Sequence, residues 1–184
     1  MTAANIHSAP IPVDRPGPAV WLVAPHGGAG VSTLAHYLSF AGDSDRQWPC
    51  GNDVENESPY AVMVARETDD GLKKAHAMLM EYREKNLDCE LLGLVTVASS
   101  PTLDKSVRQY RDVVKTAAPA HWRIGWHRFL PAAGLSSLPR WHPLDGVPEQ
   151  TKGARAAVPK DVIDAGVGIV TAIQRSLPHL RSGH

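Results

Sequence analysis

The sequence predicts a three-layer α/β domain with a mostly parallel sheet. Short apolar runs alternate along the chain with segments of helical periodicity, and a glycine-rich turn connects the first run to the first helical segment. Such alternation is typical of βαβ units, whose right-handed crossovers place helices on the faces of a sheet. A chain of 184 residues is long enough for one domain with a sizeable core, which we expect to span residues 19–184.

The first predicted strand covers residues 19–24, a continuous apolar run of the kind found in buried parallel strands. A helix is expected over residues 32–41, ending near Gly42. Residues 42–59 are polar and contain glycine and proline, so they are predicted to form a loop without a strand. Three aspartates fall on this predicted loop: Asp43, Asp45 and Asp53.

Later apolar runs predict strands at residues 60–65, 90–98 and 121–127. Helices are expected to follow Thr68 and Ser100, because threonine and serine are favoured before a first helical turn. Pro159 is expected to open the last helix, since proline suits the first helical position. No internal repeat interrupts this order of elements.

Two segments are rich in proline. Residues 1–18 are predicted to form a flexible or extended tail. Residues 128–158 have no clear period, which is unusual for so long a stretch in a compact domain. This second segment is interpreted as a functional loop, a partner-binding segment or packed irregular structure. The partner-binding interpretation expects that the segment can be deleted without unfolding the domain.

The composition bears on partners and location. The formal net charge is zero, so the chain carries no direct signature of nucleic-acid binding. No apolar run is long enough to predict a membrane span, and the first residues lack the pattern of a signal peptide. A cytoplasmic location is therefore expected, with Cys50 and Cys89 as two reduced thiols.

The glycine-rich turn lies in the stretch PHGGAGVST, residues 25–33. A strand, a glycine-rich turn and a helix in this order form a phosphate-binding loop when the turn ends in G-K-[ST], with backbone N–H groups around the phosphates. Here Gly30 is followed by Val31, then by Ser32 and Thr33, so the phosphate lysine is absent.

This stretch resembles the deviant Walker A motif of the ParA/MinD-like P-loop ATPases, K-G-G-x-G-K-[ST]. Six residues match the motif: Gly27, Gly28, Ala29, Gly30, Ser32 and Thr33. His26 and Val31 replace its two lysines, so the motif is degenerate. The order of elements over residues 19–126 is similar to that class as well.

The resemblance implies a P-loop NTPase-like fold and a site for nucleotide phosphates in the loop. Its residues would be His26, Gly27, Gly28, Ala29, Gly30, Val31, Ser32 and Thr33. Ser32 would bind Mg²⁺ only if nucleotide is bound, so ATP or ADP with Mg²⁺ are the cofactors to consider. The class also implies a homodimer, a protein partner, and bacterial partitioning, positioning or mobile-element transfer.

The lost lysine decides the expected activity. A charge-assisted hydrogen bond contributes roughly 1.5–3 kcal/mol, so nucleotide binding would weaken about 10- to 100-fold. Losing one transition-state donor costs about 10²–10³ in rate. In that class a strand after the first helix also supplies carboxylates for Mg²⁺, and here none is predicted. We assign no catalytic residue, although Arg46, Arg66 or Lys73 could supply a positive charge from elsewhere.

The leading hypothesis is therefore a non-hydrolysing regulatory or scaffolding relative of these ATPases, a pseudo-ATPase. One alternative is a weakly hydrolysing ATP-binding dimer, and another is an interaction module that uses residues 128–158. A metal site is disfavoured because the histidines lack ligand spacing with cysteines or carboxylates. Three of them lie near one another in sequence: His121, His127 and His142.

Overall fold

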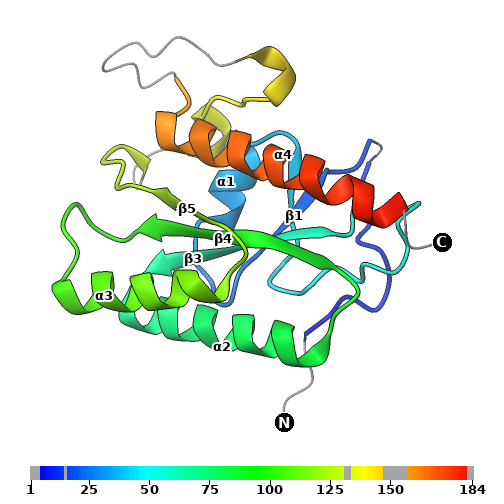
Figure 1. The fold of residues 1–184 in the computed structure, drawn as a ribbon. Helices are drawn as coiled ribbons and strands as arrows, with labels where there is room; N and C mark the ends of the chain where they lie inside the picture. The colour runs from blue at the N-terminus through cyan, green and yellow to red at the C-terminus, as the bar shows by residue number, and fades with distance from the viewer. Residues whose placement is uncertain (1–4, 15, 131–133, 147–156, 182–184) are drawn as a thin grey trace.

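The computed structural model describes residues 5–14, 16–130, 134–146 and 157–181. Within them, a five-stranded all-parallel sheet lies between two layers of helices (Figure 1). The predicted three-layer α/β class is confirmed. The strands are β1 (Val20–Val23), β2 (Ala41–Asp43), β3 (Tyr60–Glu67), β4 (Glu90–Ala98) and β5 (His121–Ile124).

The strand order β2-β1-β3-β4-β5 determines where a ligand is expected. The chain leaves β1 toward β2 on one side and then returns to β3 on the other side of β1. A crevice forms at such a reversal, outside the carboxyl ends of the two strands, and ligands of open α/β sheets bind there. In this chain the reversal lies between the loops that follow β1 and β3.

The helices cover both faces of the sheet. They are α1 (Val31–Tyr37), α2 (Asp69–Lys85), α3 (Lys105–Val114) and α4 (Lys160–Arg181). α1 and α4 pack on one face and α2 and α3 on the other, each pair over its own apolar core (Figure 1). Thr68 caps α2 as predicted, since its hydroxyl accepts from the Gly71 N–H at 3.0 Å.

The prediction that residues 42–59 contain no strand is wrong at the start of that range. Residues 41–43 form β2, in register with Val20 to Leu22 of β1. The predicted helix over residues 32–41 is correspondingly shorter and ends at Tyr37. β2 has no apolar pattern because it is a three-residue edge strand, held by backbone pairing. Its Gly42 lies so close to the Trp21 ring that a Cβ there would approach the ring to 2.7 Å.

The described part of residues 128–158 is packed irregular structure. It contains two short 3₁₀ helices, η3 (Leu135–Ser137) and η4 (Pro143–Asp145). Trp141 between them is only 4% exposed and belongs to the core under α1 and α4. Its backbone N–H donates to the Tyr37 carbonyl at 2.8 Å. Deleting the segment would remove Trp141 from the core, so a deletion is expected to destabilise the domain.

The described part of the N-terminal segment lies against the domain. Ile6 forms an isolated parallel bridge with Trp48, and the Ile11 N–H donates to the Glu57 carboxylate at 2.9 Å. Both cysteines are free and buried. Among the described helices, none combines the length and apolar character that crossing a bilayer requires.

Candidate functional site

The glycine loop leaves β1 at the reversal of strand order and enters α1. Gly28 and Gly30 have φ angles of 75° and 98°, in the left-handed region that side chains other than glycine rarely adopt. Gly30 is also the residue that caps α1. The two glycines therefore let the chain turn within a few residues, and the loop they form lines a cavity at the carboxyl end of β1.

Val31 begins α1 and points toward the core. Its side chain is 7% exposed and packs in the apolar cluster on the α1 face. α1 has only seven residues, so its N-terminus offers a weak dipole for binding an anion. Any positive charge that holds an anion at this loop must therefore come from side chains of other elements.

Ser32 and Asp43 place a hydroxyl and a carboxylate side by side next to the loop. The Ser32 hydroxyl donates to Asp43 Oδ2 at 2.9 Å, and the Asp45 N–H donates to Asp43 Oδ1 at 2.9 Å. β2 places this carboxylate beside the loop because Asp43 is its last residue. The sequence analysis predicted no strand ending in aspartate after the first helix. The structure contains one, β2, and its Asp43 is hydrogen-bonded to Ser32, the serine expected to bind Mg²⁺.

The two oxygen groups of Ser32 and Asp43 can hold Mg²⁺ only together with oxygen atoms from a bound molecule. Mg²⁺ prefers octahedral oxygen coordination and usually takes one or two carboxylates together with phosphate oxygens and water. No group of three or more histidine, cysteine or acidic side chains able to hold a metal occurs among the described residues. A magnesium ion at Ser32 and Asp43 would therefore depend on phosphate oxygens supplied by a bound nucleotide.

Two arginines lie beside the loop that lacks the phosphate lysine. Arg66, near the end of β3, donates from Nη1 to the Gly28 carbonyl at 3.3 Å. Arg46 is exposed on a turn after β2, with a φ angle of 63°. Both side chains line a cavity of about 420 Å³ together with the loop. Lys73, the third candidate cation, is paired with Asp69 on α2 instead and does not line this cavity.

His26 connects the loop to β3. Its Nδ1 lies 2.9 Å from the Gly27 carbonyl, and its Nε2 accepts from the Arg66 N–H at 3.5 Å. These contacts match a neutral ring with its proton on Nδ1, because the carbonyl can only accept and the amide can only donate. In this form both ring nitrogens are engaged, so His26 positions the loop and the Arg66 backbone rather than offering a free donor.

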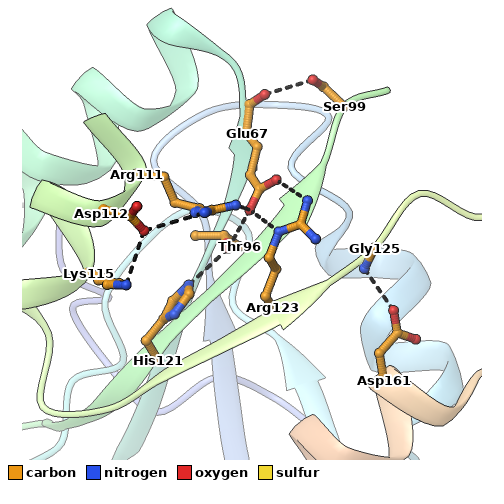
Figure 2. A network of polar contacts seen from close by, with 10 residues as sticks. All are labelled: Glu67, Thr96, Ser99, Arg111, Asp112, Lys115, His121, Arg123, Gly125 and Asp161. Carbon is orange, nitrogen blue, oxygen red and sulfur yellow. Dashed lines mark hydrogen bonds and ion pairs between the residues drawn. The ribbon is translucent and has the colours of Figure 1, made fainter. Parts of the chain in front are cut away.

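Next to Arg66, Glu67 anchors a buried ionic network (Figure 2). Its side chain is fully buried, with an exposed fraction of 0%. Arg123 on β5 donates from Nε and Nη2 to its two carboxylate oxygens at 2.8 Å each, and Arg111 on α3 adds a contact of 3.3 Å. The network fixes the carboxyl ends of β3 and β5, between which β4 lies, and so supports the neighbouring Arg66.

His121 lies beside the same network, in surroundings that favour its neutral form. The Thr96 hydroxyl donates to Glu67 Oε1 at 2.9 Å and lies 2.9 Å from His121 Nε2 (Figure 2). Burial lowers the pKa of His121, and the nearby positive charges of Lys115 and Arg111 lower it further. The ring therefore serves as an uncharged partner of Thr96.

The cavity brings together every residue predicted for the phosphate site. All of its loop positions line it: His26, Gly27, Gly28, Ala29, Gly30, Val31, Ser32 and Thr33. Asp43 was missed as a site residue because an edge strand without apolar character leaves little signal. The three histidines considered for a metal are separate: His121 contacts Thr96, His127 contacts Asp161, and His142 caps η4.

Comparison of the chain with protein-family models, curated proteins and solved structures finds no match.

Proposed function

We propose that this chain binds a nucleotide di- or triphosphate with Mg²⁺ in the loop cavity and acts as a regulatory or scaffolding protein without efficient hydrolysis. One observation carries the proposal. The oxygen pair of Ser32 and Asp43 lines the same cavity as the glycine loop and two guanidinium groups, Arg46 and Arg66. A metal-bound polyphosphate needs oxygen ligands for its metal and positive charge for its phosphates, and this cavity offers both.

The arginines support phosphate binding in the absence of a loop lysine. A guanidinium can donate two parallel hydrogen bonds to a phosphate and keeps its charge at any physiological pH. Arg66 is half-buried and held against the Gly28 carbonyl, so little rotamer freedom remains to be lost on binding. Two such groups can offset the loss of about 1.5–3 kcal/mol expected from the missing lysine.

Hydrolysis has less support than binding. Val31 is buried in the core, so no cation stands on the first turn of α1 to stabilise transition-state charge. Removing one such donor typically lowers a rate by about 10²–10³. The alternative of a weakly hydrolysing homodimer requires a charge supplied across the dimer. That alternative predicts nucleotide turnover that falls in Ser32→Ala; turnover at background would exclude it.

The proposed biological role comes from the resemblance of the loop to ParA/MinD-like ATPases. In that setting a nucleotide-bound regulator would act on a protein partner in bacterial partitioning, positioning or mobile-element transfer, in the cytoplasm. Bound nucleotide would control the shape of the loop and therefore the surface offered to the partner.

Thermal unfolding tests the binding proposal. Mg²⁺ with ATP or ADP at millimolar concentration is expected to raise the Tm of the wild-type chain, because a ligand that binds only the folded state stabilises it. Ser32→Ala should reduce the contribution of Mg²⁺ to this shift. Ser106→Ala, an exposed serine on α3, is the matched control and should behave as wild type. No shift with either nucleotide would contradict the proposal.

A second candidate function, partner binding through the segment before α4, is favoured by one residue. Leu144 in η4 is 88% exposed, the most exposed large apolar side chain among the described residues. Leu144→Asp is expected to abolish capture of a protein partner by the purified chain. The fold should be unchanged, because surface substitutions alter stability by only about 0.5 kcal/mol. A partner retained by this variant would place the binding surface elsewhere.

A further inference from the structure

A second cavity lies beside the loop cavity, on the face of the sheet that α1 and α4 cover. It has a volume of about 210 Å³, and its lining is mainly apolar. Its apolar wall includes Leu34, Val97, Ile124, Trp126, Leu130 and Val162. Gly30, Thr33 and Arg66 line both cavities, so a ligand held by the glycine loop could extend into the second one.

Tyr37 lines this cavity and has an unused hydrogen-bonding group. It lines the wall from the last turn of α1 and is only 1% exposed. Its hydroxyl has no hydrogen-bond partner among the described residues. Burial, together with the negative charge of Asp161, raises the pKa of Tyr37, so the hydroxyl remains protonated and can donate. Tyr60 has a similarly unpaired hydroxyl, but of the two tyrosines only Tyr37 lines this cavity, so its hydroxyl is the one that a ligand held there could pair.

His127 is a second polar group in the wall, held in one orientation. Its Nε2 lies 2.9 and 3.0 Å from the two carboxylate oxygens of Asp161. Asp161 is itself fixed by the backbone N–H groups of Gly125 and Val162, at 2.7 and 3.0 Å (Figure 2 shows the Gly125 contact). The other ring nitrogen, Nδ1, has no partner in the described structure.

We propose that this second cavity holds the neutral ring system of the bound nucleotide, its nucleobase, with the Tyr37 hydroxyl donating to a ring acceptor atom. The inference rests on the proposed function, because Arg66 and the glycine loop must hold the phosphates. A mainly apolar cavity with few polar groups suits a flat ring whose edge carries one or two hydrogen-bonding atoms. It does not suit a sugar, whose several hydroxyls would each need a partner.

Calorimetric titration with two anions tests the inference. Mg·ATP and Mg·tripolyphosphate share a triphosphate chain, but only ATP carries a nucleoside, and the Tyr37 variant separates the contribution of its base from that of its sugar. We expect the wild-type chain to bind ATP about tenfold or more tightly than tripolyphosphate. Tyr37→Phe should weaken ATP binding about five- to twentyfold, as one lost hydrogen bond implies, and leave tripolyphosphate binding unchanged.

Tyr60→Phe is the matched control. The Tyr60 hydroxyl is likewise buried and without a partner in the described structure, but Tyr60 lies outside this cavity, so the variant should bind both anions as wild type does. Equal wild-type affinities for the two anions, or unchanged ATP binding in Tyr37→Phe, would overturn the inference while leaving the phosphate site in place. Binding of neither anion would overturn the proposed function and this inference with it.

Discussion

We expect the proposed anion binding in the loop cavity to depend most on Arg66. It lies next to the loop, is tied to the Gly28 carbonyl and is half-buried, whereas Arg46 is exposed on a turn. Arg66→Ala is expected to weaken Mg·ATP binding about 10- to 100-fold, the effect of one lost charge-assisted hydrogen bond. Arg83→Ala, on an exposed arginine near the end of α2, should leave the affinity unchanged, as measured by equilibrium titration. Equal affinities in the two variants would contradict this role.

Val31→Lys tests whether the lost lysine limits the affinity for nucleotide. The new ammonium group would lie at the first turn of α1, next to the cavity that Val31 lines. We expect Mg·ATP affinity to rise about tenfold, and stability to fall by about 1–3 kcal/mol because a buried valine leaves the core. Calorimetry and chemical denaturation measure the two effects separately. Unchanged affinity in a folded variant would show that the arginines already supply the required charge.

At the scale of elements, the segment that contains η3 and η4 belongs to the core through Trp141. Trp141→Ala is expected to destabilise the fold by about 3–5 kcal/mol, the usual result of truncating a buried aromatic side chain. Leu144→Ala in the same segment is the control and should change the free energy of unfolding by less than about 0.5 kcal/mol. Urea denaturation measures both. Similar stability of the two variants would mean that the segment is not part of the core.

The network around Glu67 joins three strands and α3, so breaking it should affect the whole carboxyl edge of the sheet. Glu67→Gln removes the charge that faces Arg123 and Arg111 but keeps the shape of the side chain. We expect a loss of about 3 kcal/mol, because an unpaired charge then remains in a largely buried site. Arg123 is partly exposed, so water stabilises part of its charge. The expected loss therefore lies at the low end of the roughly 3–5 kcal/mol usual for a broken buried pair. Unaltered stability in urea denaturation would contradict this role.

At the scale of the whole molecule, the stability is expected to fall in mild acid. Burial lowers the pKa of His121, so the unfolded chain takes up a proton at a higher pH than the folded chain does. Stability is therefore complete above the ordinary histidine pKa of about 6.5 and declines as the pH falls below it. Denaturation midpoints measured between pH 7 and pH 5 should show this decline. His121→Gln should flatten it, and an equal slope in this variant would exclude His121 as its source.

The sequence predicted the fold well because alternating apolar runs and helical segments fix a parallel α/β sheet. It missed β2, since a three-residue edge strand held by backbone pairing needs no apolar residues. The glycine spacing is a local signal, and all of the residues it indicated, 26–33, line the loop cavity. The sequence named Arg46 and Arg66 as possible sources of charge, but their place beside the loop, like that of Asp43, follows from the strand order, which one sequence does not specify. The free hydroxyl of Tyr37 was likewise beyond local patterns.

The most direct test of the central claim, that the loop cavity holds a metal-bound polyphosphate, is calorimetric titration of the full chain with Mg·ATP. We expect saturable binding of one nucleotide per chain, reduced to below detection at millimolar concentration in the Arg46→Ala, Arg66→Ala double variant. Absence of heat from the wild-type chain at millimolar Mg·ATP, or equal binding by the double variant, would contradict the claim.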